Sequence, residues 1–513
     1  MKALDLAIIF GYLIGIVLFG AWFGRKQKTT RDYFLGDRSV PWWAVAFSIV
    51  ATETSTITFI SVPGIAFSRG GNYQFLQLVF GYMLGRIVIA ILFIPSYFRG
   101  ELMTVYQLLD RRFGGKIKML AASLFVVMRN IADGIRLLLT AIVLAAVYTS
   151  FQPTANAETI VVASIILIGV AMIVFTYFGG MEAVIWVEVV QLGIYIVGAL
   201  AAAIILTQSI EGGLSGALAL GSQFNKFSLF DFSFDMTKTF TFWAGLIGGC
   251  FLTMSTHGTD QYLVQRYLCT DRPRRAATAL LTSGAIVLAQ FIGFLFIGVL
   301  LFAFYHPHTD PGYATAASTA YPFTGGDRVF PDFITRHLPT GLSGLVVAAI
   351  FAAAMSSSLN SIAATTVNDL YRPFRQKLSD THYLKVSHWL TLLWGVVQIG
   401  VALLVRNQNR SALDQALSVA SLINGPVLGV FLVGVFLKRV SEPPALIGMV
   451  TSMAAMIYIR FATGIAWTWY VFIGSLITLV AAWLASFAFA AAPASRSQQL
   501  AVSPTEGLEE ISE

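Results

Sequence analysis

The chain has 513 residues, of which 57% are hydrophobic and only 12% are charged, and its mean hydropathy is +0.74. Soluble domains are about 45–50% apolar and about 25% charged, so this composition excludes a disordered chain and an ordinary cytosolic enzyme. It predicts an all-α polytopic membrane protein. The net charge of +7 does not indicate a nucleic-acid partner, because basic residues that flank membrane spans give the same total.

Apolar segments long enough to cross a bilayer recur along the chain and predict about 13 transmembrane helices. The expected spans are 4–23, 43–67, 74–98, 119–148, 159–178, 183–206, 239–265, 276–305, 339–366, 386–405, 411–437, 443–462 and 466–490. An odd number of spans puts the two ends of the chain on opposite sides of the membrane. The long loops 207–238 and 306–338 are expected to hold short surface helices or a partial lid.

The distribution of basic residues predicts which end is inside. Most of the 33 Lys and Arg residues lie in loops on one side of the predicted membrane, and basic loops stay in the cytoplasm. The N-terminus is therefore expected outside and the C-terminus in the cytoplasm of a multi-pass protein of the cell (inner) membrane, with the lipid bilayer as a partner. Residues 491–513 are expected to form a disordered cytoplasmic tail.

Two predicted spans contain polar runs where a lipid-facing helix would be rich in leucine. Span 43–67 contains TETST followed by Pro63-Gly64, and span 239–265 contains MSTHGTDQ. Interrupted helices in corresponding positions of two halves indicate the central site of a transporter, since unwound backbone is tolerated only where it lines a site.

The two polar runs lie five spans apart, which predicts two inverted five-helix repeats. The expected units are 1–42 (an extra N-terminal helix and cytoplasmic loop), 43–206 (first repeat), 207–238 (external loop), 239–437 (second repeat) and 438–490 (two C-terminal helices), followed by the tail at 491–513.

Span 339–366 is the third unusual segment, because hydroxyl side chains follow a run of alanines. Ser356 and Ser357, with Asn360 and Ser361 one turn further, cluster at helical spacing. Together with a carbonyl one turn earlier, such as that of Ala353, the hydroxyls would form an oxygen cage suited to Na⁺. The alternative is that they only donate to the carbonyl four residues before, as Ser and Thr in membrane helices often do.

Charged residues and one histidine inside the predicted spans are further candidates. Glu53 is a functional hypothesis, because intramembrane carboxylates are costly, although it could also cap broken backbone. His257 is either a pocket group or proton carrier, or a hydrogen-bonded structural histidine. Asp133 and Arg136 are spaced to pair on one helix. Arg129 and Arg136 would either meet an anionic substrate or steady their helix.

Six segments make the chain resemble the sodium/solute symporter family, which includes sodium-coupled transporters of glucose, proline, iodide and monocarboxylates. The segments are SIVATETSTITFISVPG (48–64), DGIRLLLTAIVL (133–144), FGGMEAVIWVEVVQ (178–191), GTDQYLVQR (258–266), AAIFAAAMSSSLNS (348–361) and NGPVLGVFLVGVFLKRVSEP (424–443). The resemblance implies the leucine-transporter fold, with extra helices at both ends, and Na⁺ as the coupling ion.

The resemblance also implies a Na⁺ site between spans 43–67 and 339–366. Its ligands would be the carbonyls of Ala51, Thr54 and Ala353 and the hydroxyls of Ser356 and Ser357. The family usually has about three more residues before its final S-x-N-S. If the helix is instead aligned on Asn360, Ala353 and Ala354 fall where the hydroxyls are expected. Both alignments stay open.

Two carboxylates would act in ion coupling by the same resemblance. Proline-transporting members carry a carboxylate at the position of Glu53, which would set the local charge for Na⁺ or take a proton. Glu188 lies where the family usually has Asp after a Thr, near the cytoplasmic exit for sodium. Here the preceding residue is Val187, so the charge is kept and the hydroxyl is lost.

The implied substrate pocket includes Thr58 and Gln77, which match sugar-contacting positions of glucose transporters. The stacking Tyr and adjacent Trp of those members fall at Thr256 and His257. Asp260, in the same polar run, is a further substrate-binding candidate. The sugar-binding Gln falls at Leu417. Losing most of the aromatic and amide groups that a sugar ring needs argues against glucose and leaves the solute open.

The expected function is sodium-coupled symport of a small organic solute by alternating access. A proton-coupled symporter of the same fold is the first alternative, and a transporter-like sensor or a passive channel is an alternative from another class. The sequence contains no HExxH, GxSxG or P-loop motif and no clustered His/Asp metal set. We therefore expect a protein that is not an enzyme and has no catalytic residues.

Overall fold

The computed structural model describes residues 2–25, 27–152, 154, 156–306, 323, 325–355, 358–408 and 422–491. The chain is 80% helical and its described residues form no strand. The helices are α1 (Ala3–Gly24), α2 (Thr30–Leu35), η1 (Gly36–Arg38), α3 (Trp42–Glu53), α4 (Thr56–Phe67), α5 (Leu76–Leu92), α6 (Ile94–Phe98), α7 (Tyr106–Arg112), α8 (Gly115–Phe151), α9 (Ala157–Ser209), α10 (Gly213–Gln223), η2 (Ala244–Gly248), α11 (Gly249–Gly258), α12 (Gln261–Leu268), α13 (Pro273–Tyr305), η3 (Gly326–Arg328), α15 (Val329–His337), α16 (Leu342–Met355), α17 (Leu359–Thr365), η4 (Thr366–Tyr371), α18 (Asp380–Val405), α20 (Asn424–Phe436), α21 (Glu442–Ala462), η5 (Trp467–Trp469), α22 (Tyr470–Ala485) and η6 (Ser486–Ala488).

Membrane-spanning helices are present, as the composition predicts. Among the described residues, α1, α9, α13, α18, α21 and α22 are each long and apolar enough to cross a membrane. The α3–α4 pair is also long and apolar enough to cross a membrane if its two bent halves form one span. The shorter apolar helices α5, α16 and α20 coincide with further expected spans. The total of thirteen and the sidedness of the termini stay predictions.

One pair of expected spans is joined differently from the prediction. Spans 159–178 and 183–206 were expected to be separated by a short loop, whereas α9 runs through both and departs from helical geometry only at Gly180 (φ 60°, ψ −163°). Glycine adopts this positive φ without steric cost. The side chain of Gln27 donates to the Gly179 carbonyl at 2.6 Å. The two spans therefore meet at a kink.

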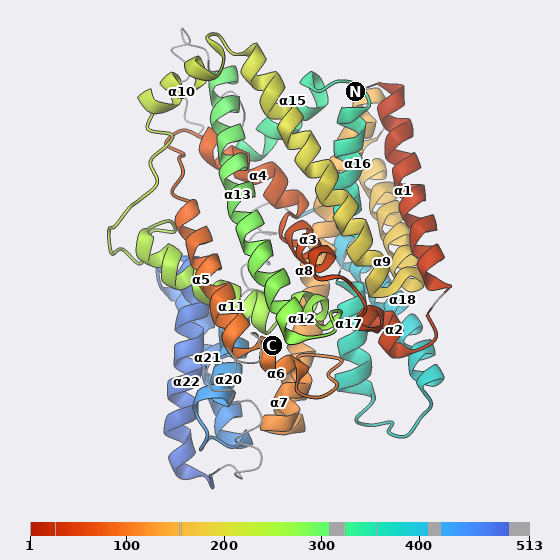
Figure 1. The fold of residues 1–513 in the computed structure, drawn as a ribbon, viewed down its shortest axis with the longest axis vertical. Coiled ribbons are helices and arrows are strands. Elements are labelled where there is room, and N and C mark those ends of the chain that lie inside the picture. The colour runs from red at the N-terminus through yellow and green to blue at the C-terminus, as the bar shows by residue number, and fades with distance from the viewer. Residues whose placement is uncertain are drawn as a thin grey trace.

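The helices form two groups around α13 (Figure 1). On one side, α1 packs against α9 and α16, and α18 packs against α8 and α9. On the other side, α20, α21 and α22 pack together. Gly81 and Gly85 on α5 face the backbone of Gly249 and Cys250 on α11, which lets these two helices approach closely.

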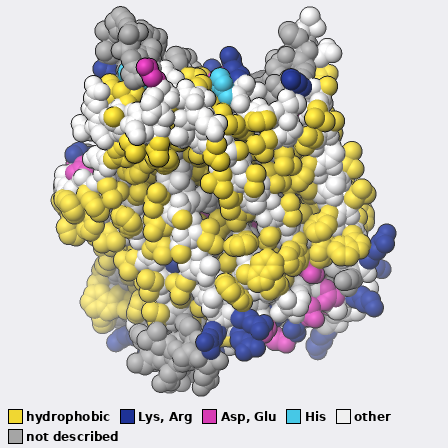
Figure 2. Space-filling model, turned by 45° about the horizontal axis from the view of Figure 1, so that its top comes forward, with side chains coloured by type: hydrophobic (Ala, Val, Ile, Leu, Met, Phe, Trp, Pro, Cys, Tyr) yellow, Lys and Arg dark blue, Asp and Glu magenta, His cyan; other side chains and the backbone are white. Residues whose placement is uncertain are grey.

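The outer surface is apolar where a bilayer would contact it. Figure 2 shows hydrophobic side chains over the middle of one face and Lys and Arg gathered mostly toward its lower edge. Leu18 on α1, Leu200 on α9 and Leu404 on α18 are 65%, 60% and 81% exposed. An exposed apolar surface of this kind marks a membrane contact, as the bulk composition predicts.

The two long loops contain the short helices that the sequence predicts, α10 in 207–238 and α15 in 306–338. After α10, the buried side chain of Lys226 donates to the carbonyls of Phe67 and Ser68 at 3.2 and 2.6 Å. These contacts fasten the loop to the end of α4. Burial lowers the pKa of Lys226 to about 8. Residues 492–513, where the tail was predicted, lie outside the described residues.

Candidate functional site

The first interrupted helix breaks between α3 and α4, within the TETST run. Thr54 and Ser55 have non-helical backbone angles, and the two halves are bent by 58°. The Ser55 hydroxyl accepts the Thr58 N–H at 3.3 Å, and the Thr58 hydroxyl donates to the Glu53 carbonyl at 2.9 Å. Short hydroxyl side chains that compete for backbone bonds explain why the helix stops here.

The second interrupted helix breaks between α11 and α12, within the MSTHGTDQ run. Both the N–H and the hydroxyl of Thr259 donate to the Ser255 carbonyl at 3.0 Å, which ends α11. Asp260 then caps α12, since its Oδ1 accepts the Tyr262 N–H at 2.8 Å. Both breaks lie where the polar runs predict them.

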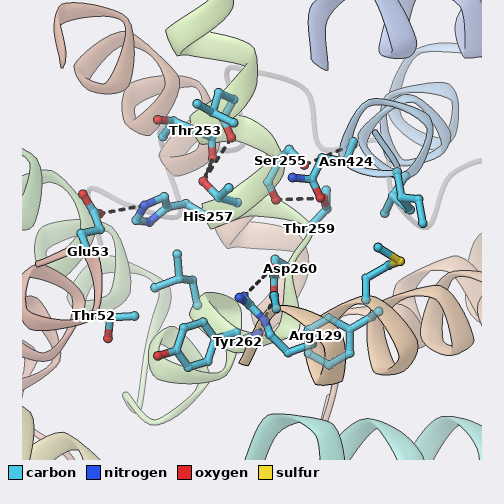
Figure 3. A pocket seen from close by; sticks show the side chains of 18 of the residues that line it. Thr52, Glu53, Arg129, Thr253, Ser255, His257, Thr259, Asp260, Tyr262 and Asn424 are labelled. Carbon is cyan, nitrogen blue, oxygen red and sulfur yellow. Dashed lines mark hydrogen bonds and ion pairs between the residues drawn. The ribbon is translucent and has the colours of Figure 1, made fainter. Parts of the chain in front are cut away.

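A cavity of about 470 Å³ lies between the two breaks (Figure 3), within the size range of small-molecule sites. Its polar wall comes from both interrupted segments and from α8, and its apolar wall is rich in aromatic rings. The main lining residues are Thr52, Glu53, Thr58, Phe75, Tyr82, Tyr106, Phe125, Met128, Arg129, Thr253, Ser255, Thr256, His257, Thr259, Asp260, Tyr262, Phe291 and Asn424.

Glu53 is the centre of a charged group at one side of the cavity. Its Oε1 pairs with Nη2 of Arg86 on α5 and lies 2.8 Å from Nε2 of His257 on α11. The other ring nitrogen of His257 is 2.8 Å from the Tyr267 hydroxyl. Within the described chain, Nε and Nη1 of Arg86 are buried without a hydrogen-bond partner. Glu53 therefore provides the compensation for a fully buried guanidinium.

Arg129 and Asp260 form a second ion pair in the cavity wall. Nη2 of Arg129, on α8, donates to Oδ2 of Asp260 at 2.7 Å (Figure 3). The guanidinium carbon also lies 4.4 Å from the centre of the Tyr262 ring, within cation–π range. The aspartate that caps α12 thus also orients an arginine at the cavity.

Glu188 lies behind the cavity wall and is fully buried. Arg266 on α12 donates to both of its oxygens, at 2.6 and 3.3 Å. The hydroxyls of Ser48 and Thr52 on α3 donate to it as well. Since Thr52 also lines the cavity, one residue separates this bidentate ion pair from the candidate site. The predicted ion-coupling role of Glu188 stays a prediction.

The residues predicted to bind Na⁺ are partly outside the described chain. Ala51 and Thr54 are buried at the end of α3, and Ala353 is buried near the end of α16. The Thr54 hydroxyl donates to the Val50 carbonyl at 2.6 Å and lies 2.8 Å from Nε2 of Gln290 on α13. Ser356 and Ser357 lie outside the described residues, as does the side chain of Ala354, so the choice between the two alignments stays open.

Four of the five predicted substrate residues line the cavity, namely Thr58, Thr256, His257 and Asp260. Gln77 does not line it. Its amide instead donates to the Gln74 and Phe240 carbonyls at 3.1 and 3.2 Å and accepts the Asp231 N–H at 3.0 Å. This side chain connects α5 to the loop before η2, and its role in substrate binding stays a prediction.

Sequence reasoning missed several polar partners of the site. Gln290, Arg266 and Ser48 contact the predicted site residues, yet none of them was predicted to do so. Asp133 was expected to pair with Arg136, and does so at 3.5 Å. It also accepts bonds from the N–H and hydroxyl of Ser358 at the start of α17. The available signal was a polar residue within an apolar span, as at Gln290.

Comparison with known proteins identifies the family. The family model for the sodium:solute symporter family matches residues 33–452. The chain belongs to this family. It is 31% identical to the sodium/sialic acid symporter NanT of Aliivibrio fischeri over 94% of this chain and 92% of that protein. Other matches are a sodium-dependent multivitamin transporter, a sodium-coupled monocarboxylate transporter and a sodium/iodide cotransporter, so its relatives are transporters and support Na⁺ as the coupling ion.

Solved structures have the same fold. A Na⁺-coupled sialic acid symporter in a substrate-bound, outward-open state matches with a TM-score of 0.83 and 28% identity, covering 96% of this chain and 99% of that one. A nucleobase-cation-symport-1 family transporter, Mhp1, matches with a TM-score of 0.55 and 13% identity over 91% of this chain and 97% of its own. The expectation of an all-helical, leucine-transporter-like fold is confirmed, and the two inverted five-helix repeats stay a prediction.

Proposed function

We propose that the chain is a Na⁺-coupled symporter of a small organic acid that works by alternating access in the cell membrane. We infer an acidic solute from the position of Arg129 in the cavity wall. An arginine guanidinium has several N–H donors in a planar fork that matches a carboxylate. Its bond to Asp260 uses only Nη2 of that fork.

The remaining wall suits the organic part of such a solute. Phe75, Tyr106, Phe125 and Phe291 provide apolar and aromatic surface, which is typical of small-molecule pockets that hold a few polar groups for orientation. The relatives named for sialic acid and monocarboxylates act on carboxylic acids. Their names support the same class of solute for this chain without selecting one member of it.

For the ion, the proposed ligands remain Ala51, Thr54, Ala353, Ser356 and Ser357. The break after α3 supports this assignment, because a helix end leaves carbonyl groups without intrahelical partners. Carbonyl and hydroxyl oxygens suit a hard cation such as Na⁺. Binding of Na⁺ next to the break would then stabilise the same pair of helices that line the cavity, which couples the ion to the solute.

The same proposal includes inverted repeats that move against each other, with the N-terminus outside and the basic loops in the cytoplasm. Its support is the pair of interrupted helices on either side of one cavity and the basic edge of the surface in Figure 2. In this scheme the cavity opens alternately to the two sides.

The proposal predicts sodium-driven uptake of an acid into proteoliposomes. Radiolabelled sialic acid and pyruvate serve as acidic probes, and glucose serves as the neutral control. We expect an inward Na⁺ gradient to drive uptake of an acid and K⁺ in its place to drive none. Uptake driven by a proton gradient alone, with Na⁺ inert, would contradict sodium coupling. Uptake of glucose in preference to both acids would contradict the assignment of an acid.

The role of Arg129 is tested by Arg129→Lys, which keeps the charge beside Asp260 and removes the planar fork. Losing one charge-assisted hydrogen bond to a carboxylate should raise KM for the acid about 10-fold or more, while Na⁺ affinity stays the same. Arg136→Lys is the matched control on the same helix, because Arg136 does not line the cavity. Equal effects of the two variants on KM would remove Arg129 from the binding site.

A further inference from the structure

Four carboxylates of the described residues lie around the cavity and the helix breaks, and each of them pairs with an arginine. The four pairs, in order of the carboxylate, are Glu53–Arg86, Asp133–Arg136, Glu188–Arg266 and Asp260–Arg129. All eight side chains are no more than 25% exposed. The partners come from different helices in three of the four pairs. The charges of these four carboxylates are therefore balanced before any ion or solute binds.

Glu188 is the most completely paired of these four carboxylates. Its side chain and that of Arg266 are both 0% exposed. Both carboxylate oxygens accept guanidinium N–H groups, and Ser48 and Thr52 donate to them too. A Na⁺ ion that used Glu188 as a ligand would have to displace a guanidinium tethered to α12. Removing one partner of a buried ion pair is strongly unfavourable, so we expect the Arg266 guanidinium to stay bound to Glu188 and Na⁺ not to replace it.

Charge balance also limits how many ions the interior can accept. An isolated charge in the low-dielectric interior of a membrane protein is costly. One bound Na⁺ adds a single positive charge, which the negative charge of an acidic solute offsets. A second Na⁺ would add a positive charge that the solute does not offset, and each of the four carboxylates named here is already paired with an arginine.

We propose that these arginines act as built-in cations that keep the interior carboxylates from binding Na⁺, and that one Na⁺ binds per chain in each transport cycle. This inference rests on the proposed function, which supplies the Na⁺ site itself. Glu53 and Glu188 then act as fixed charges that hold α5, α11 and α12 in place, and the coupling ion is held by neutral oxygens.

The number of ions can be measured with Na⁺ alone. The purified full-length chain is titrated with NaCl against choline chloride at constant ionic strength, and binding is followed by the fluorescence of its 10 tryptophans and by its melting temperature. The number of ions bound at saturation is counted by equilibrium dialysis with radiolabelled Na⁺, and we expect about one per chain, since the Hill coefficient alone sets only a lower limit on the number of sites. A value near 2 for the unaltered protein would overturn the inference and leave sodium coupling intact. No response to Na⁺ would contradict the proposed function itself.

Arg266→Gln at pH 9 tests the mechanism, because it leaves Glu188 without its cation. We expect the number of Na⁺ ions bound per chain to rise toward about 2 and to return to about 1 in the double variant Glu188→Gln with Arg266→Gln. The matched control is Arg112→Gln, a change at a buried arginine that donates to the carbonyls of Gly434, Leu437 and Lys438. A folded Arg266→Gln variant that still binds only about one Na⁺ per chain would overturn the inference.

Discussion

The two interrupted helices use their carboxylates in different ways. At the break between α3 and α4, a hydroxyl, that of Ser55, caps the new helix, while Glu53 points away to Arg86 and His257. At the break between α11 and α12, one side chain does both tasks, because Asp260 caps α12 and pairs with Arg129.

This difference separates backbone stabilisation from charge. At the first break, the cap is neutral and the carboxylate is an electrostatic group that links α3 to α5 and α11. At the second break, Asp260 is both the helix cap and the counter-ion of Arg129, so removing its side chain removes both interactions. We therefore expect removal of the carboxylate charge to have its largest effect on stability and uptake at the first break. At the second break, a suitable substitution should remove the charge and keep the helix cap.

Glu53→Gln should have the largest effect, since it leaves the buried guanidinium of Arg86 without a carboxylate. Breaking a buried ion pair costs about 3–5 kcal/mol. We expect a strongly lowered melting temperature and loss of uptake. In the double variant Glu53→Gln with Arg86→Met, the melting temperature should recover while uptake stays low. If Glu53→Gln melts like the unaltered chain, Arg86 has compensation other than Glu53.

Asp260→Asn and Asp260→Ala should have intermediate and separable effects. Asparagine is as good an N-cap as aspartate, and replacing a cap by alanine costs about 0.5–2 kcal/mol. Both variants remove the partner of Arg129 and should reduce uptake of the acidic probe. Only the alanine variant should also lower the melting temperature.

Ser55→Ala is the matched change at the first break, because it removes a cap and leaves every charge in place. It should lower the melting temperature by an amount similar to the difference between the two Asp260 variants. Equal melting temperatures for Asp260→Asn and Asp260→Ala would show that the cap does not matter at the second break.

The positions of both breaks could be predicted from sequence because their cause is local. TETST and MSTHGTDQ each concentrate hydroxyl and carboxylate groups within about two helical turns, and these groups compete for backbone bonds. The kink at Gly180 was harder to predict from the sequence. FGGMEA contains two glycines and an acidic residue, as a short loop would, and only the backbone angles distinguish the two.

The partners of the charged residues could not be predicted, because they are set by the tertiary fold. Glu53 and Arg86 are 33 residues apart, Glu188 and Arg266 are 78 apart, and Asp260 and Arg129 are 131 apart. Only the Asp133–Arg136 pair, three residues apart on one helix, followed from spacing. Gln77 is a different case. Its family position indicates a substrate contact, whereas in the structure its amide bonds to backbone groups of Gln74, Phe240 and Asp231.

Asp369 differs from the carboxylates at the two breaks, because it is a buried carboxyl for which the structure gives no ion pair. It lies in η4, where Oδ1 accepts the Thr104 hydroxyl at 2.9 Å and Oδ2 has no hydrogen-bond partner within the described chain. Burial raises its pKa from 3.8 to about 7, although Thr104 and Lys118 act in the opposite direction. This is the behaviour expected of a carboxyl removed from water.

The sign of the pH effect follows from this shift. The folded chain holds the Asp369 proton more tightly than the unfolded chain, so the group contributes stability that is fully present below about pH 3.8 and lost as the pH rises through about 7. Asp369→Asn should therefore melt a few degrees higher than the unaltered chain at pH 8, and the advantage should shrink toward pH 5. Melting curves of both proteins over this range measure the difference. Parallel pH profiles would mean that Asp369 is ionised in the fold, and that a buried carboxylate of this protein does not need an arginine to carry its charge.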